Sequence, residues 1–133
     1  MRTGRRDKLG PQGERAAVRF LRRQGFRVLG RNLVTPFGEA DIVCESPDHV
    51  VVVVEVKSRR SERPGPPPEA AVTQKKRQGL TRILEHLVRA NGWHDRPRRI
   101  DVVAVEFRRR RWLGPKPALR HITDAVRQGG AAR

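Results

Sequence analysis

The sequence has 133 residues, of which 30 are Lys or Arg and 14 are Asp or Glu, and its formal net charge is +16. This length suits one domain with its own core, and the charge indicates a polyanionic partner. Nucleic acid is favoured over an anionic membrane surface, because the sequence has no long apolar helix or lipidation signal.

Cys44 is the single cysteine, which excludes an internal disulfide, and the basic start shows no signal peptide. We therefore expect a cytoplasmic protein.

The first predicted element is a helix over residues 11–24, which Gly25 would end. Its apolar stripe consists of Ala17, Val18 and Leu21. Glu14 falls on the same inward side of the helix. An inward carboxylate in a first turn serves either the helix dipole or a metal site.

A strand is expected over residues 26–34, and residues 38–57 read as a β-hairpin, because two apolar runs flank a Ser-Pro-Asp-His turn. If this turn is centred between Pro47 and Asp48, the antiparallel register places Asp41 opposite Val54 or Glu55.

The hairpin end away from the turn gathers Asp41, Glu55 and Lys57 at one edge of an apolar sheet. The second hairpin strand has Val on both of its faces, so we expect it to be central and covered on both sides. Ionised carboxylates beside such a core are costly unless they are paired or bound to metal. Two carboxylates and a backbone carbonyl would suit Mg²⁺. In the alternative interpretation Lys57 neutralises Glu55, and Asp41 simply ends a strand.

After the hairpin, residues 58–68 are too rich in Pro and charge for regular structure, and they form either a basic substrate flap or a crossover linker. A second helix is predicted to start at an N-cap, Thr73, and to end at Gly92. Stepping back by fours from its apolar stripe places Lys76 on the buried side.

The rest of the chain is predicted to hold a strand over residues 99–107, a basic loop or hairpin tip at 108–111 and a short strand at 119–122. The order is α-β-β-β-α-β-β, an α/β fold with a mixed sheet flanked by helices. The predicted organisation is a flexible basic arm at 1–10, one domain at 11–126 and a disordered tail at 127–133.

Several common site types are missing from the sequence. It has no Gly-rich phosphate loop, and no Cys and His set has the spacing of a zinc site. The four His are scattered and are interpreted as surface or structural. The chain has no Tyr, and its few aromatics form no platform for stacking a run of bases, so specificity through stacking is not expected.

Glu14 in the first helix, Asp41 on the second strand and Glu55-x-Lys57 on the third resemble the PD-(D/E)xK nuclease superfamily, the fold of restriction endonucleases and archaeal Holliday-junction resolvases. One branch is more similar, the uncharacterised protein family typified by YraN. Its pattern is seen in Gly13-Glu14, Gly25-Phe26-x-x-Leu29-x-Arg31-Asn32, Gly38-Glu39-x-Asp41, Val54-Glu55-Val56-Lys57-x-Arg59, Val72-Thr73-x-x-Lys76, Arg99-x-Asp101-Val102 and His121-Ile122-x-Asp124-Ala125. The departures are Ala40 in place of Pro, Arg77 in place of Gln and Val126 in place of Phe.

The resemblance implies a metal-dependent, structure-directed DNA endonuclease. Asp41 and Glu55 would hold Mg²⁺ or Mn²⁺ with the carbonyl of Val56 and with Glu14, and Lys57 would assist catalysis. The residues expected to grip phosphates are Lys76, Arg59, Arg31, Arg60 and Arg77. Branched or duplex DNA is the expected partner, with RNA and a homodimer left open. The alternatives are a non-catalytic nucleic-acid-binding module on the same scaffold and a structural protein that meets ribosomal RNA.

Overall fold

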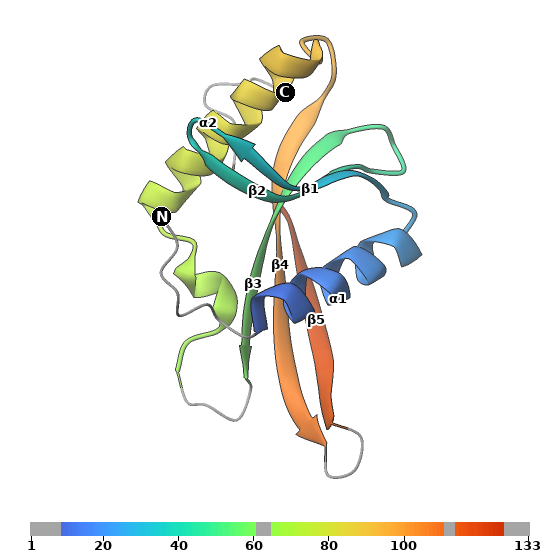
Figure 1. Cartoon of the computed structure of the whole chain (residues 1–133), viewed down its shortest axis with the longest axis vertical. Coiled ribbons are helices and arrows are strands. Elements are labelled where there is room, and N and C mark those ends of the chain that lie inside the picture. Colours follow the sequence, from blue (N-terminus) through green and yellow to red (C-terminus); the bar gives the residue numbers. More distant parts are fainter. Residues whose placement is uncertain (1–8, 61–64, 111–113, 127–133) are drawn as a thin grey trace.

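The computed structural model describes residues 9–60, 65–110 and 114–126 (Figure 1). Its elements are helix α1 (Leu9–Arg23), strands β1 (Arg27–Thr35), β2 (Gly38–Glu45) and β3 (Val51–Arg60), the short 3-10 helix η1 (Pro68–Ala71), helix α2 (Gln74–Asn91), and strands β4 (Arg98–Arg110) and β5 (Gly114–Val126). The predicted order α-β-β-β-α-β-β is confirmed. Residues 1–8 of the predicted arm and the predicted tail lie outside the described residues.

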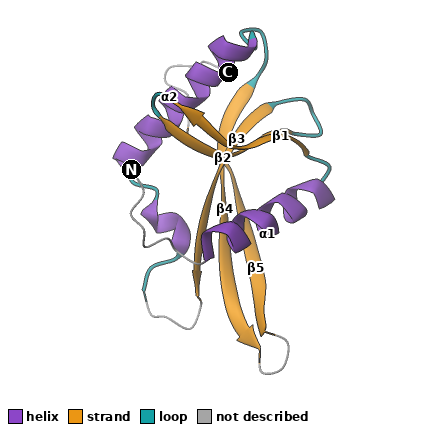
Figure 2. Ribbon diagram, in the orientation of Figure 1, coloured by secondary structure: helices purple, strands orange, loops and turns teal. Residues whose placement is uncertain are grey.

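The described strands form one five-stranded sheet in the order β1-β2-β3-β4-β5 (Figure 2). β3 and β4 run parallel, whereas the other neighbouring strands run antiparallel. Parallel neighbours cannot be joined by a tight turn, and the crossover through η1 and α2 makes this connection. The predicted mixed sheet is thereby confirmed.

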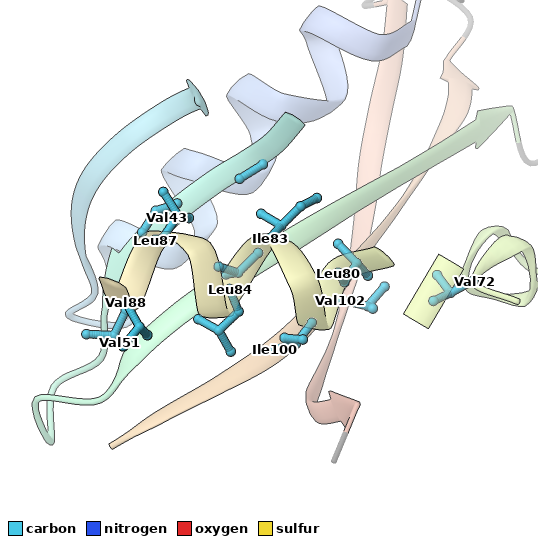
Figure 3. Close-up of a cluster of buried hydrophobic side chains, with 12 residues drawn as sticks. Val43, Val51, Val72, Leu80, Ile83, Leu84, Leu87, Val88, Ile100 and Val102 are labelled. Atoms are coloured by element: carbon cyan, nitrogen blue, oxygen red, sulfur yellow. The ribbon is translucent and has the colours of Figure 1, made fainter. Parts of the chain in front are cut away.

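The two helices cover opposite faces of the sheet. β3 carries apolar side chains on both of its faces, so each face needs a helix to cover it. On one face α2 packs its stripe of Leu80, Ile83, Leu84, Leu87 and Val88 over Val51, Val53, Ile100 and Val102 (Figure 3). On the other face α1 packs Ala17, Val18 and Leu21 over Val52, Val54, Val103 and Val105. Burying one such side chain contributes about 1.5–3 kcal/mol. This packing, more than helix propensity, holds both helices on the sheet.

The ends of α2 are those that the sequence predicts. Thr73 is the N-cap and its side chain accepts a hydrogen bond from the Lys76 backbone N–H, and Gly92 closes the helix in the left-handed conformation. α1 ends at Arg23, shortly before Gly25, which has φ 90°. α1 begins at Leu9, two residues earlier than predicted.

Strands β3, β4 and β5 extend beyond their predicted bounds, and strand pairing explains these extensions. β3 continues through Ser58, Arg59 and Arg60, which pair with Val105, Glu106 and Phe107 of β4. β4 continues through Arg110, so Arg108–Arg110 belong to a strand and not to a loop, and β5 is far longer than 119–122. When a segment pairs with a neighbouring strand, its backbone N–H and C=O groups are hydrogen-bonded whatever charge its side chains carry. β5 accepts Pro115 and Pro117 because it is an edge strand.

Candidate functional site

The site forms where β2 and β3 separate. Their pairing runs from Glu45–Val51 to Ile42–Val54, and one further step of this register brings Asp41 level with Glu55, in agreement with the prediction. At that point the Asp41 carboxylate oxygen Oδ2 accepts a hydrogen bond from the Val56 N–H, at 2.9 Å. The Asp41 side chain thus occupies the opening between the two strands.

Glu55 lies beside this opening and is 4% exposed. Its Oε2 is 3.2 Å from Nζ of Lys57 and 3.3 Å from Nζ of Lys76. The first contact shows that Glu55 and Lys57 lie on the same face of β3. Lys76 reaches Glu55 from α2, but its side chain is 45% exposed, so the prediction that it lies on the buried side of the helix is only partly correct. Glu55 is therefore compensated by two ammonium groups from two different elements.

Asp41 is in a different electrostatic position. Burial, followed by the charge of Glu55, raises the pKa of Asp41 to about 7, and the charge of Glu14 also raises it. The hydrogen bond from Val56 and the charge of Lys76 act in the opposite direction without cancelling this rise. The influence of Glu14 means that α1 carries this third carboxylate toward the cluster. Asp41 thus shares its surroundings with two further carboxylates, whereas the two ammonium groups of the cluster pair with Glu55.

Gly13 explains how α1 comes this close to the site. A Cβ atom on Gly13 would lie 1.9 Å from Oγ and 3.1 Å from Cβ of Ser58 on β3. A side chain at this position would force the Ser58 hydroxyl to rotate and would still press on the Ser58 Cβ, so glycine favours this close approach of the helix to the strand. Gly13 belongs to the Gly13-Glu14 motif, but its role could not be predicted, because a contact between distant segments leaves no local signal.

The described residues hold no group of three or more His, Cys, Asp or Glu side chains arranged as a ready-made metal site. A cation at the strand opening would therefore be held by the two carboxylates of Asp41 and Glu55 and by a backbone carbonyl, as predicted for Val56. These are oxygen donors, the type that Mg²⁺ and Mn²⁺ prefer. The role of Glu14 as a ligand stays a prediction.

The predicted phosphate-gripping residues lie on several elements. Arg31 on β1 and Arg77 on α2 are exposed, and Arg60 is half-buried near the end of β3. Arg59 is engaged within the chain, since its Nη1 donates to the carbonyl oxygens of Gly65 (3.0 Å) and Pro66. The structure therefore gives Arg59 a role in closing the crossover segment. Lys76 is the residue of this set that contacts the acidic cluster.

A second buried carboxylate was missed by the sequence analysis. Asp101 on β4 is fully buried and accepts hydrogen bonds from Arg99 Nε (2.9 Å) and from the Asp124 N–H (2.8 Å), and its other oxygen lies 2.8 Å from His121 Nε2. Burial opposes ionisation, yet these partners lower the pKa of Asp101. This network anchors β5 to β4 at the register shift between Ile100 and Val102. It confirms the structural interpretation of His121.

No helix in the described ranges is long and apolar enough to cross a membrane.

Comparison with known proteins gives a family but no activity. The model of the uncharacterised protein family UPF0102 matches residues 13–105. A UPF0102 protein of Pelobacter propionicus is 39% identical over 117 residues, which are 87% of this chain and 80% of the relative. A UPF0102 protein of Roseiflexus castenholzii is 39% identical over 130 residues, 95% of this chain and 98% of the relative. One from Trichlorobacter lovleyi is 36% identical over 88% of each chain.

Proposed function

The chain belongs to the uncharacterised protein family UPF0102, and we propose that it is a metal-dependent, structure-directed DNA endonuclease. The observation that carries the proposal is the convergence of Asp41, Glu55 and Lys57 where β2 and β3 separate. Buried carboxylates gain nothing for a protein of charge +16 that only has to bind a polyanion. They are useful if a cation and a phosphate meet there.

The donor set fits Mg²⁺ or Mn²⁺, with Asp41, Glu55 and the Val56 carbonyl as ligands and Glu14 in support. The fit rests on the oxygen donors. Burial first, and then the charge of Glu55, raise the pKa of Asp41, and a bound cation would offset both effects. When bound, the cation supplies Lewis acidity toward the scissile phosphate and the attacking water.

The remaining roles fall to the lysines. Lys57, whose ammonium group is held 3.2 Å from Glu55, is placed to orient the attacking water or to stabilise the charge that develops on the phosphate. Lys76 reaches the same carboxylate from α2 and would grip a neighbouring phosphate. Phosphate contacts of this kind position the backbone without reading base sequence. We therefore propose that the shape of the DNA, and not its sequence, selects the substrate.

The second candidate is a non-catalytic module that docks DNA or RNA on the same scaffold. It is favoured by the two ammonium groups that already compensate Glu55, since such a carboxylate can be stable without a cation.

A cleavage assay separates the two functions. Branched, flapped and linear DNA, with a matched RNA duplex, are incubated with the wild type or with Asp41→Asn in Mg²⁺, in Mn²⁺ or in chelator. We expect cleavage of a branched or flapped substrate by the wild type with either metal, and loss of at least about a hundredfold in rate for Asp41→Asn. Equal product from both proteins would indicate a contaminating nuclease and would remove the proposal.

A further inference from the structure

A pocket of about 350 Å³ lies beside the acidic cluster, between the turn that joins β1 to β2 and the first half of α2. The turn contributes Phe37, the start of β2 contributes Gly38 and Glu39, and the helix contributes residues that include Lys75, Lys76 and Ile83. This volume is at the lower end of the range for ligand pockets and suits a ligand of about the size of one nucleotide. Lys76 is common to the pocket and to the carboxylate cluster.

The wall formed by the turn is held in place before any ligand arrives. Thr35 Oγ1 donates to the Gly38 carbonyl at 2.6 Å and accepts from the Phe37 N–H at 3.1 Å. Gly38 has φ 131°, and a Cβ there would lie 3.3 Å from Ile83 Cδ1, so the turn rests directly on α2.

Phe37 is the aromatic residue of the pocket lining, and it is exposed. Its ring meets that of His86 edge to face, with centroids 6.2 Å apart, and the residue is still 45% exposed. A ring that is held in position and still exposed offers an apolar face on which a base can stack. One ring is no platform for a run of bases, but it is enough for a single base.

We propose that this pocket takes one unpaired nucleotide of a DNA strand, with its base stacked on Phe37 and its phosphate gripped by Lys75 and Lys76. This inference rests on the proposed function of the acidic cluster, which would act on a phosphate next to that nucleotide. A base inside a duplex cannot enter a side pocket, because it is stacked and paired. The pocket therefore selects DNA with an unpaired nucleotide at the cleavage position.

The test measures stacking and binding without cleavage, in chelator. The probe is a DNA duplex with one unpaired 2-aminopurine, whose fluorescence is quenched when its base stacks, and the reference is the same duplex fully paired. Because stacking on an aromatic side chain contributes about 1–3 kcal/mol, we expect the wild type to quench the probe and to prefer it about five- to hundredfold. Phe37→Leu should lose the quenching and most of the preference, while its affinity for the paired duplex stays unchanged.

The matched control is Val34→Ser, which alters an 80% exposed apolar residue close to the same turn and outside the pocket lining. It should retain both quenching and preference. Equal binding of bulged and paired duplex by the wild type would overturn the inference, and so would quenching by Phe37→Leu, once circular dichroism shows that this variant is folded. Binding of deoxyadenosine monophosphate more tightly than the bulged DNA would assign the pocket to a free nucleotide, and this too would overturn it.

The outcome is independent of catalysis. Quenching that depends on Phe37, together with no metal-dependent cleavage, would keep the pocket and remove the endonuclease. Cleavage that depends on Asp41, together with no role for Phe37, would support the endonuclease and rule out the nucleotide pocket.

Discussion

Asp41 lies between the apolar core and the open end of the site, and its carboxylate accepts a hydrogen bond from Val56. Ionising the Asp41 carboxylate in this position lowers the stability of the fold. A carboxyl group with a raised pKa stabilises the folded state while it is protonated and destabilises it once it is charged. An ionised Asp41 would therefore serve an activity while it lowers the stability of the fold. Such conflicts between activity and stability are common at functional sites.

The first prediction follows from the sign of this shift. The pKa of Asp41 is about 7 in the folded state and 3.8 as its ordinary value, so its contribution to stability is complete below about pH 4 and is lost as the pH rises through 7. Without divalent ions, the wild type should lose about 1–3 kcal/mol of unfolding free energy relative to Asp41→Asn between pH 4 and pH 8. Urea denaturation of both proteins at these pH values measures the difference. Parallel stability profiles would show that Asp41 ionises at no cost.

Metal binding should reverse this loss, because a ligand must be ionised to bind and because the cation binds the folded state alone. Mg²⁺ should therefore raise the melting temperature of the wild type more at pH 8 than at pH 6. Glu55→Gln, which keeps the shape of the side chain, should show almost no shift. If the wild type and Glu55→Gln respond equally to Mg²⁺, the carboxylates are not ligands.

At the scale of elements, the site depends on the close contact of α1 with β3 at Gly13. This contact fixes the depth of the helix on the sheet and thereby the distance of Glu14 from Asp41. A side chain at position 13 must displace either Ser58 or the helix.

We predict that Gly13→Ala lowers the unfolding free energy by about 1–3 kcal/mol, as overpacking of a closed contact does. Gly10→Ala is the matched control, since a Cβ at Gly10 of the same helix meets nothing within 4 Å. This control should be neutral or stabilising by up to about 1 kcal/mol, because alanine favours the helix more than glycine does. Chemical denaturation of both variants decides the point, and an equal effect of the two substitutions would mean that helix propensity dominates at both positions.

The elements that the sequence could predict are those with a strong local signal. The apolar stripe of α2 with its caps Thr73 and Gly92, and the hairpin of β2 and β3, are set by periodicity and turn residues, and both were predicted correctly. The convergence of Asp41 with Glu55 followed from the hairpin register. The long β4–β5 ladder and the Asp101 network could not be predicted, because each depends on the pairing of distant segments. The pocket at Phe37 was missed for the same reason, since its walls come from two elements.

At the scale of the whole molecule, the net charge of +16 sets the energy of the encounter with DNA. A net positive charge of this size attracts the phosphates of DNA, and binding releases the counterions that were associated with them. We predict a log–log slope of affinity against salt of about −4 to −7, for roughly five to eight neutralised phosphates. Fluorescence anisotropy with a duplex at several salt concentrations measures it. A scrambled duplex should compete almost equally, and a slope near zero would rule out the electrostatic account.

The last prediction separates an enzyme from a binding module, and it follows from the different charges at the site. In chelator, Asp41→Asn and Glu55→Gln remove negative charge next to a bound phosphate, and Glu55→Gln also frees the ammonium groups of Lys57 and Lys76. Both variants should bind DNA as tightly as the wild type or up to about tenfold more tightly, while cleavage in Mg²⁺ is lost.

Lys57→Ala should lose cleavage with a small loss of affinity, because one cation among 30 matters little to binding. Lys76→Ala should weaken both.

The opposite pattern has an equally definite meaning. If the wild type is inactive on every branched and linear substrate while Asp41→Asn and Glu55→Gln bind DNA more weakly, the carboxylates support the fold or the surface that meets a partner. The pairing of Glu55 with Lys57 and Lys76 would then be the reason for the burial of Glu55, since an ion pair that loses one partner leaves an uncompensated charge. Melting temperatures of the same variants distinguish these two cases. A variant that binds weakly and melts early has lost the fold, whereas one that binds weakly and melts like the wild type has lost a contact surface.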